Sequence, residues 1–312
     1  MIKSAHANRA ISNPITAVTN FFNKYSTAVL LLPYAFLFIL FIVIPVIAAM
    51  GLSFTFFDTV QMPRFIGLQN YIDIFTADPD FFRYVVPTTL LFMIVAGLGG
   101  YILSFFLAWT IAQLPKVPRM ILAIIIYSPT LMGPVMVQQF WRTFFNADHS
   151  GWFNYWLLRF NIIDVPQAWV QGEHLLTITI IVTLVSSMGV GFLAMLAGIL
   201  NVNHELYEAA YIDGVSNRFQ EIIYVTIPTA RPLMLFGAVM SIVSTVNASS
   251  MGVALFGRNP TPNNVAQMVL PHIEDFGFLR MEMGYAAALS VVLLVFMRVI
   301  SLGAQKMFSD KD

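Results

Sequence analysis

Residues 205–228 read ELYEAAYIDGVSNRFQEIIYVTIP and lie between two strongly apolar segments. The stretch predicts two short helices hinged at a glycine. Asn203 is placed to cap the first helix, because an asparagine side chain accepts hydrogen bonds from the free N–H groups of a first turn. Asp213 and Gly214 are placed to end it, since glycine adopts the left-handed conformation of a C′ position without steric cost.

The second short helix is expected to begin at Ser216, as its cap, and to be bounded by Pro228 and Pro232. Each helix carries an apolar stripe at helical spacing, made of Leu206, Ala209 and Ala210 in the first and Phe219, Ile222 and Ile223 in the second. Such stripes need a covering surface. The segment is too short and too charged to cross a bilayer, so it predicts either a pair of membrane-surface helices or a docking surface for another subunit.

Three parts of this stretch, Glu208-Ala209-Ala210, Asp213-Gly214 and Ile227-Pro228, resemble the EAA loop of permease subunits of binding-protein-dependent ATP-binding cassette importers. Pro228 comes one residue later after the glycine than in the commonest form, as in some oligosaccharide permeases. The resemblance implies a cytoplasmic coupling helix seated in a cleft of an ATPase subunit. The coupling residues that it implies are Glu208, Ala209, Ala210, Asp213, Gly214, Arg218 and Pro228. The alternative is an amphipathic helical loop without a special role.

Composition separates the chain from soluble globular proteins. Hydrophobic residues make up 58% of it, charged residues 10%, and it has no cysteine, whereas soluble domains contain about 25% charged residues. We therefore predict an all-α, polytopic integral membrane protein. A net charge of zero gives no basic field for nucleic acid.

Six apolar stretches approach the roughly 20 residues that a helix needs to cross a bilayer. They are 28–54, 86–112, 120–140, 176–200, 233–256 and 285–303. We expect a cytoplasmic N-terminal segment at 1–27 and a six-span permease domain at 28–312. Its importer core is expected at about 82–307, with the coupling loop at 203–230.

Orientation follows from the distribution of basic residues. With six spans, nine of the 16 Lys and Arg residues fall inside and six outside, with Arg298 in the membrane. Basic residues are enriched in cytoplasmic loops. The bias places both termini and the 203–230 loop in the cytoplasm, and we expect a multi-pass protein of a bacterial inner membrane.

Segments outside the coupling loop resemble sugar permeases of the maltose and oligosaccharide type. They are FIGLQNY at 65–71, DPDFF at 78–82 and RMEMGYAAA at 280–288. This resemblance implies four kinds of partner besides the lipid bilayer: a second permease subunit, two ATPase subunits and an extracytoplasmic solute-binding protein. It also implies that ATP and magnesium bind to the ATPase subunits, and that this chain carries no cofactor.

The stretch 233–256 is unusually polar for a membrane span. Hydroxyls and amides are costly in lipid unless they are paired or face water. Two explanations of this polarity stay open. The residues form hydrogen bonds between helices, or they line a path for a hydroxyl-rich solute. The candidates for such a path are Asn247, Ser244, Ser250, Tyr127 and Ser128.

Enzyme motifs are missing from the sequence. It has no Gly-x-x-x-x-Gly-Lys-Ser/Thr loop, no zinc-binding histidine spacing and no Gly-x-Ser-x-Gly elbow. We therefore expect neither catalytic residues nor a metal site. The alternatives to an ATP-driven permease are a secondary, ion-coupled transporter and a non-transport scaffold. The lone Arg298 argues against the first, because ion coupling normally uses paired intramembrane groups.

Overall fold

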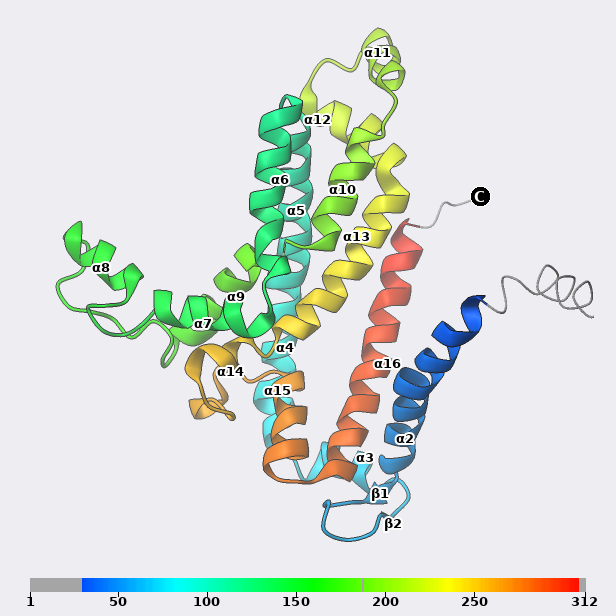
Figure 1. The fold of residues 1–312 in the computed structure, drawn as a ribbon, viewed down its shortest axis with the longest axis vertical. Helices are drawn as coiled ribbons and strands as arrows, with labels where there is room; N and C mark the ends of the chain where they lie inside the picture. Colours follow the sequence, from blue (N-terminus) through cyan, green and yellow to red (C-terminus); the bar gives the residue numbers. More distant parts are fainter. Residues whose placement is uncertain (1–29, 187, 309–312) are drawn as a thin grey trace, which may run out of the picture.

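The computed structural model describes residues 30–186 and 188–308, and nearly all of their regular structure is helical (Figure 1). The predicted cytoplasmic segment 1–27 lies outside the described residues. The elements are η1 (Ile39–Val43), α2 (Ile44–Leu52), β1 (Thr55–Phe56), β2 (Arg64–Phe65), α3 (Gln69–Thr76), η2 (Phe81–Val85), α4 (Val86–Phe92), η3 (Met93–Leu98), α5 (Gly99–Ala112), α6 (Lys116–Leu131), α7 (Pro134–Phe144), α8 (Trp152–Arg159), α9 (His174–Ser186), α10 (Val190–Leu200), α11 (His204–Ile212), α12 (Arg218–Glu221), η4 (Ile222–Thr226), α13 (Ile227–Ala248), α14 (Met251–Phe256), η5 (Pro262–Asn264), α15 (Val269–Glu274), η6 (Asp275–Leu279) and α16 (Met283–Phe308).

Several helices are long and apolar enough to cross a membrane. Four helices meet this criterion singly: Leu30–Leu52, Phe81–Ala112, Arg218–Phe256 and Met283–Lys306. The pairs α6/α7 and α9/α10 pass the same test together, which gives up to six spans within the described residues. The prediction of an all-helical polytopic membrane protein is confirmed, while the count of six spans stays a prediction.

The predicted third span, 120–140, is wrong as a single helix. Helix α6 ends at Leu131, and α7 leaves it at an angle of 100°. Gly133 is extended, with ψ 146°, and Pro134 opens α7. A proline disfavours the helical conformation in the residue before it, and it is well tolerated in the first turn of a helix. The chain therefore turns at Gly133-Pro134.

The prediction that Pro228 and Pro232 bound a short second helix is also wrong. Helix α12 runs through η4, α13 and α14 as one helix, Arg218–Phe256, and Pro232 lies inside α13. The expected span 233–256 is therefore the distal part of a 39-residue helix. This helix connects the 203–230 segment directly to the bundle.

A π turn explains how the helix passes Pro228. The Ile227 N–H donates to the Ile222 carbonyl, five residues back, at the end of η4. A normal α-helix would bring the proline ring against the carbonyl four residues earlier. The wider turn moves that carbonyl away from the ring, and the Ile227 N–H keeps a helical hydrogen bond. The same arrangement precedes Pro45, after η1, and Pro87, after η2.

Helix α10 packs between α5 and α13. It crosses α13 at a glycine pair, where a Cβ added to Gly191 would lie 3.0 Å from the Gly237 carbonyl oxygen. Small residues at a crossing let two membrane helices approach closely, and packing then replaces the hydrophobic effect as the source of stability. A side chain at Gly191 would meet the backbone of α13 and push these helices apart.

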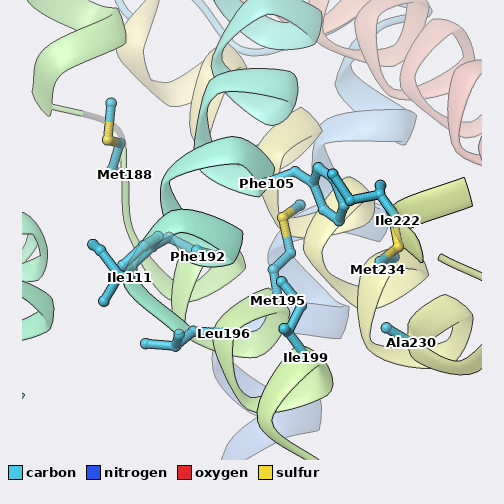
Figure 2. Packing of buried hydrophobic residues seen from close by; sticks show 11 residues of the cluster. Phe105, Ile111, Met188, Phe192, Met195, Leu196, Ile199, Ile222, Ala230 and Met234 are labelled. Atoms are coloured by element: carbon cyan, nitrogen blue, oxygen red, sulfur yellow. The ribbon is translucent and has the colours of Figure 1, made fainter. Parts of the chain in front are cut away.

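A buried apolar cluster fills the space between these helices (Figure 2). It includes Phe105 of α5, Phe192 and Met195 of α10, and Met234 of α13. Ile222 of η4 belongs to the same cluster. The start of the helix Arg218–Phe256 is therefore anchored in the bundle core.

The two ends of the molecule differ in structure (Figure 1). Helix α11 projects at one end, beyond the tips of α5, α6 and α10. At the other end, β1 and β2 form a two-stranded antiparallel hairpin that pairs Thr55 with Phe65 and Phe56 with Arg64. Helix α3 and the start of α16 lie beside the hairpin. We call these regions the elbow, residues 203–230, and the hairpin end, residues 53–85 and 269–285.

Candidate functional site

The first arm of the elbow is α11, and it has the ends that the sequence predicts. The Asn203 side chain accepts a hydrogen bond from the Glu205 N–H at 3.1 Å, so the predicted cap is confirmed. Gly214 has φ +100°. The Val215 N–H reaches the Ala210 carbonyl and the Gly214 N–H reaches the Tyr211 carbonyl, which is a Schellman motif. The bend is therefore made by the backbone around Gly214.

The second arm begins one residue later than predicted. Asn217, not Ser216, caps α12, because its side chain accepts the Gln220 N–H at 2.9 Å. The Gln220 side chain in turn accepts the Ser216 N–H. This reciprocal pair is a variant of the capping box, in which two otherwise free donors are satisfied at once.

The residues implied by the EAA resemblance are spread over both arms of the elbow and the turn between them. Glu208, Ala209, Asp213, Gly214, Arg218 and Pro228 are exposed, and Ala210 is half-buried. Pro228 lies within a continuous helix and does not end one. Their role in coupling stays a prediction.

Large apolar side chains on both arms of the elbow are exposed, because no other described residues pack over them. Phe219 is 71% exposed and Ile212 is 87% exposed, and Leu206 and Ile223 are also open. A soluble surface rarely groups large apolar residues in this way without a partner. These side chains are therefore free to contact another protein or the membrane surface.

Polar contacts close the inner side of the elbow. The Tyr211 hydroxyl donates to Glu221 Oε2 at 3.0 Å, and Arg218 donates to the same oxygen at 2.8 Å. One turn earlier on α11, the hydroxyls of Tyr207 and Thr226 lie 3.1 Å apart. The hydrogen bond to the Glu221 carboxylate raises the pKa of Tyr211. These contacts tie α11 to the helix that follows it.

A second candidate site is a cavity of about 370 Å³ between the helices. Much of its lining is apolar and includes Phe192, Met195 and Met240. Its polar lining, in which no described residue is charged, is Tyr101, Ser104, Thr130, Gln138, Thr183, Ser186, Ser241, Ser244 and Asn247. Of the predicted path residues, Ser244 and Asn247 line the cavity, whereas Tyr127, Ser128 and Ser250 do not. Ser250 instead donates to Glu274 at 3.3 Å. That these residues line a solute path stays a prediction.

Thr183 of α9 was not singled out in the sequence. Its side chain lines the cavity, it is only 1% exposed, and its hydroxyl has no partner within the described part of the chain. Thr179, one turn earlier, donates to the Leu175 carbonyl at 2.7 Å, as helical threonines commonly do. A buried hydroxyl without a partner costs about 1–3 kcal/mol. The hydroxyl oxygen is closed to solvent here, so a movement of α9 that opens it to a ligand or water in the cavity would offset that cost.

The hairpin end holds a buried polar cluster that local sequence patterns do not reveal. Asp78 Oδ2 lies 2.7 Å from His272 Nε2 and accepts the Tyr285 hydroxyl at 3.0 Å. Asp78 Oδ1 accepts the Phe81 N–H. Burial raises the pKa of Asp78, but the bond to His272 and its charge, with the Tyr285 and Phe81 bonds, hold that pKa below its usual value of 3.8. The cluster joins three segments that are far apart in the chain.

Helices able to cross a membrane, a cavity between them with hydroxyl and amide groups in its lining, and an exposed helical elbow define a multi-pass protein of the membrane-transport class. No protein-family model matches the sequence. The chain is 30% identical over 274 residues to the probable ABC transporter permease protein YesP of Bacillus subtilis (strain 168), covering 86% of each chain. It therefore belongs to the ABC transporter permease proteins.

Further similarities agree with this family. The chain is 28% identical over 284 residues to the arabinooligosaccharides transport system permease protein AraP of Bacillus subtilis (strain 168), covering 88% of this chain and 86% of the relative. A crystal structure of a bacterial ABC transporter involved in the import of the acidic polysaccharide alginate shares its fold. The TM-score is 0.75 at 23% identity, over 94% of this chain and 98% of that one.

Proposed function

We propose that the chain is the permease subunit of an ATP-driven importer, and that its solute is an uncharged sugar or oligosaccharide. The observation that carries this proposal is the cavity, which offers hydroxyl and amide groups and no charge. Neutral donors and acceptors suit a polyhydroxylated solute, since a charged lining would bind an ion in preference. The names of relatives, which refer to arabinooligosaccharides, starch degradation products and lactose, support the same solute class.

We propose that the elbow is the coupling site for an ATPase subunit. Its exposed apolar faces would fill a cleft on that subunit, and the exposed Glu208 carboxylate would accept hydrogen bonds there. This assignment implies that the elbow and both chain termini are cytoplasmic and that the membrane is a bacterial inner membrane. ATP and magnesium would then bind to two ATPase subunits, and hydrolysis would occur there.

The remaining partners fit the same scheme. The hairpin end would face away from the cytoplasm and receive an extracytoplasmic solute-binding protein. A crystal structure with a TM-score of 0.76 to this chain is of an alginate ABC transporter in complex with a periplasmic protein that holds alginate pentasaccharide. A second permease, most simply a different chain, would complete the cavity from the side that this chain leaves open.

The proposed mechanism is alternating access. Closure of the ATPase subunits on ATP would pull the elbow, and the helix Arg218–Phe256 would carry that movement to the cavity lining at Ser244 and Asn247. Packed helical interfaces switch between discrete arrangements and do not deform continuously. The cavity would therefore open alternately to each side of the membrane.

The transporter reconstituted in vesicles with its partner subunits tests this proposal. A panel of radiolabelled arabino-oligosaccharide, lactose and maltodextrin is offered with ATP, beside a uronate oligosaccharide. We expect ATP-dependent uptake of at least one neutral sugar and none of the uronate. Thr183→Val should lower the apparent affinity for that sugar about fivefold to tenfold, the loss of one buried hydrogen bond.

The matched control is Thr179→Val, one turn away on α9 and outside the cavity lining. It should leave the apparent affinity within about twofold, because its hydroxyl is already bonded to the backbone. Uptake of the uronate alone would contradict the proposed solute class. An equal loss of apparent affinity in both variants would contradict the role given to Thr183.

A further inference from the structure

Two tyrosines on one face of α11 make the contacts that set the angle of the elbow. Tyr207 and Tyr211 are four residues apart, so their side chains point in the same direction from the helix. Tyr211 reaches the Glu221 carboxylate at 3.0 Å, and Tyr207 reaches the Thr226 hydroxyl at 3.1 Å. One contact would allow α11 to swing about it. Two contacts, one turn apart, fix the direction of α11 as well as its position.

Both contact points on the second arm are themselves held in place. The Glu221 side chain is 7% exposed and is bonded to Arg218 through both carboxylate oxygens. Thr226 is fully buried, and its hydroxyl donates to the Glu221 carbonyl at 3.3 Å, so it is left to accept from Tyr207. Neither partner can follow α11 without moving the helix that carries it.

That helix continues without a break into the bundle. It runs from Arg218 to Phe256 through the π turn at η4, and Ile222 is packed in the apolar cluster with α5 and α10 (Figure 2). A force on α11 therefore has a direct route to the cavity lining on α13. By contrast, Gly214 is in open space, with nothing within 4 Å of an added Cβ, so packing does not hold the bend there.

We infer that Tyr207 and Tyr211 are positioning residues that hold α11 and the helix Arg218–Phe256 together as one rigid lever. The bend at Gly214 is then a fixed corner and not a hinge that opens during transport. This inference rests on the proposed function, because a lever matters only if a partner subunit pushes on the elbow. It assigns energy coupling to the hydroxyl groups of two side chains, Tyr207, which is half-buried, and Tyr211, which is 49% exposed.

The test uses the complete reconstituted transporter and the sugar that the wild type takes up. The double variant Tyr207→Phe/Tyr211→Phe keeps both rings and removes only the two hydroxyls. We expect it to copurify with the ATPase subunits and to hydrolyse ATP within about twofold of the wild type. The amount of sugar moved per ATP should fall at least about fivefold, the low end of coupling between distant sites.

Tyr224→Phe is the matched control. Tyr224 lies on the same helix, is 68% exposed and has no hydrogen-bond partner among the described residues. Its variant should keep the sugar-to-ATP ratio of the wild type. If the double variant keeps that ratio too, the inference of a rigid lever is wrong, and the proposed importer function is unaffected. If the wild type shows no ATP-dependent uptake, both proposals fall.

A crosslink separates a rigid lever from a flexible joint. The chain has no cysteine, so Tyr211→Cys and Glu221→Cys can be introduced together and joined by a short bifunctional thiol reagent. Without the reagent this variant should be as poorly coupled as the double phenylalanine variant. Crosslinking should restore the ratio of sugar moved to ATP hydrolysed. Transport that is blocked by the crosslink would overturn the inference, because it would mean that the elbow must open.

Discussion

The elbow and the hairpin end both use a buried carboxylate to join segments of the chain, but they differ in how closely the partner of that carboxylate is enclosed. At the hairpin end the side chains of Asp78 and His272 are 9% and 6% exposed, and the cluster is complete within this chain. At the elbow, Glu221 is buried while its partner Arg218 is 60% exposed, and Phe219 stands open beside it.

This difference distinguishes a joint that is closed within the chain from one whose edge stays open. The hairpin end satisfies its own polar groups, so it should keep its shape whether or not another protein is bound. Both ends leave apolar side chains exposed, Phe219 and Ile212 at the elbow and Met62 and Phe65 at the hairpin end, and burying such area is what drives association. Mutations in the buried cluster of the hairpin end should therefore change stability, and those in the polar contacts of the elbow should change coupling.

The largest expected effect is at the hairpin end. Asp78→Ala leaves His272 and Tyr285 buried without their common partner, and breaking a buried pair costs about 3–5 kcal/mol. We expect a clear fall in the thermal unfolding midpoint in detergent. Asp80→Ala, at an exposed neighbouring position, is the control and should leave the midpoint unchanged. Equal midpoints for the two variants would remove the contrast between the two ends.

The next effect concerns the helices that connect the two ends. Gly191→Ala would place a Cβ 3.0 Å from the Gly237 carbonyl oxygen, and overpacking of this kind costs about 1–3 kcal/mol. Gly99→Ala is the matched control, because its Cβ would meet only Leu184 at 3.8 Å. The free energy of unfolding of Gly99→Ala should equal that of the wild type or exceed it by up to about 1 kcal/mol. The unfolding midpoints of the two alanine variants should therefore move apart.

At the elbow, Gly214 should respond to backbone conformation alone. An added Cβ meets nothing within 4 Å, but φ is +100°. Gly214→Asp should leave membrane insertion intact while uncoupling ATP turnover from uptake, because non-glycine residues strain this turn by about 1–3 kcal/mol. Gly214→Val should reduce coupling further, and Gly214→Asn should reduce it less, since asparagine tolerates positive φ best of the three. Wild-type uptake in the aspartate and valine variants would show that the bend has no role in coupling.

The smallest effect is the pH dependence of the hairpin end. The folded-state pKa of Asp78 is held below 3.8, so its contribution to stability is complete above that value and is lost as the pH falls through the folded pKa. Between about pH 7 and pH 5, Asp78 should add no pH dependence. Below about pH 4 the unfolding midpoint of the wild type should fall more steeply than that of Asp78→Asn. Parallel curves would mean that the carboxylate is not stabilised in the folded protein.

Local chemistry was sufficient to predict the first arm of the elbow. Asn203 and Gly214 act through their own backbone neighbourhood, so the cap and the bend can be predicted from the sequence. The second cap could not be placed, because Ser216 and Asn217 are adjacent and both are good capping residues. Their choice depends on the Gln220 side chain, which bonds back to the Ser216 N–H.

The other differences arise from geometry that residue patterns do not carry. A proline normally ends a helix, and the π turn that lets the chain pass Pro228 has no sequence signature of its own. Asp78 and His272 are 194 residues apart, so only the fold brings them together. Thr183 could be recognised only by its missing bond within the described structure, a property of packing and not of residue type.

The central claim is that the elbow faces the cytoplasm and is gripped there by an ATPase subunit. Because the chain has no cysteine, Glu208→Cys and Met62→Cys, at two exposed sites on opposite ends, can each be labelled alone with a membrane-impermeant maleimide. The account predicts that the cysteine at 208 is labelled only from the cytoplasmic side and is protected when the ATPase subunits are bound. The cysteine at 62 should be labelled only from the other side. Labelling at 208 from the extracytoplasmic side alone would contradict the account.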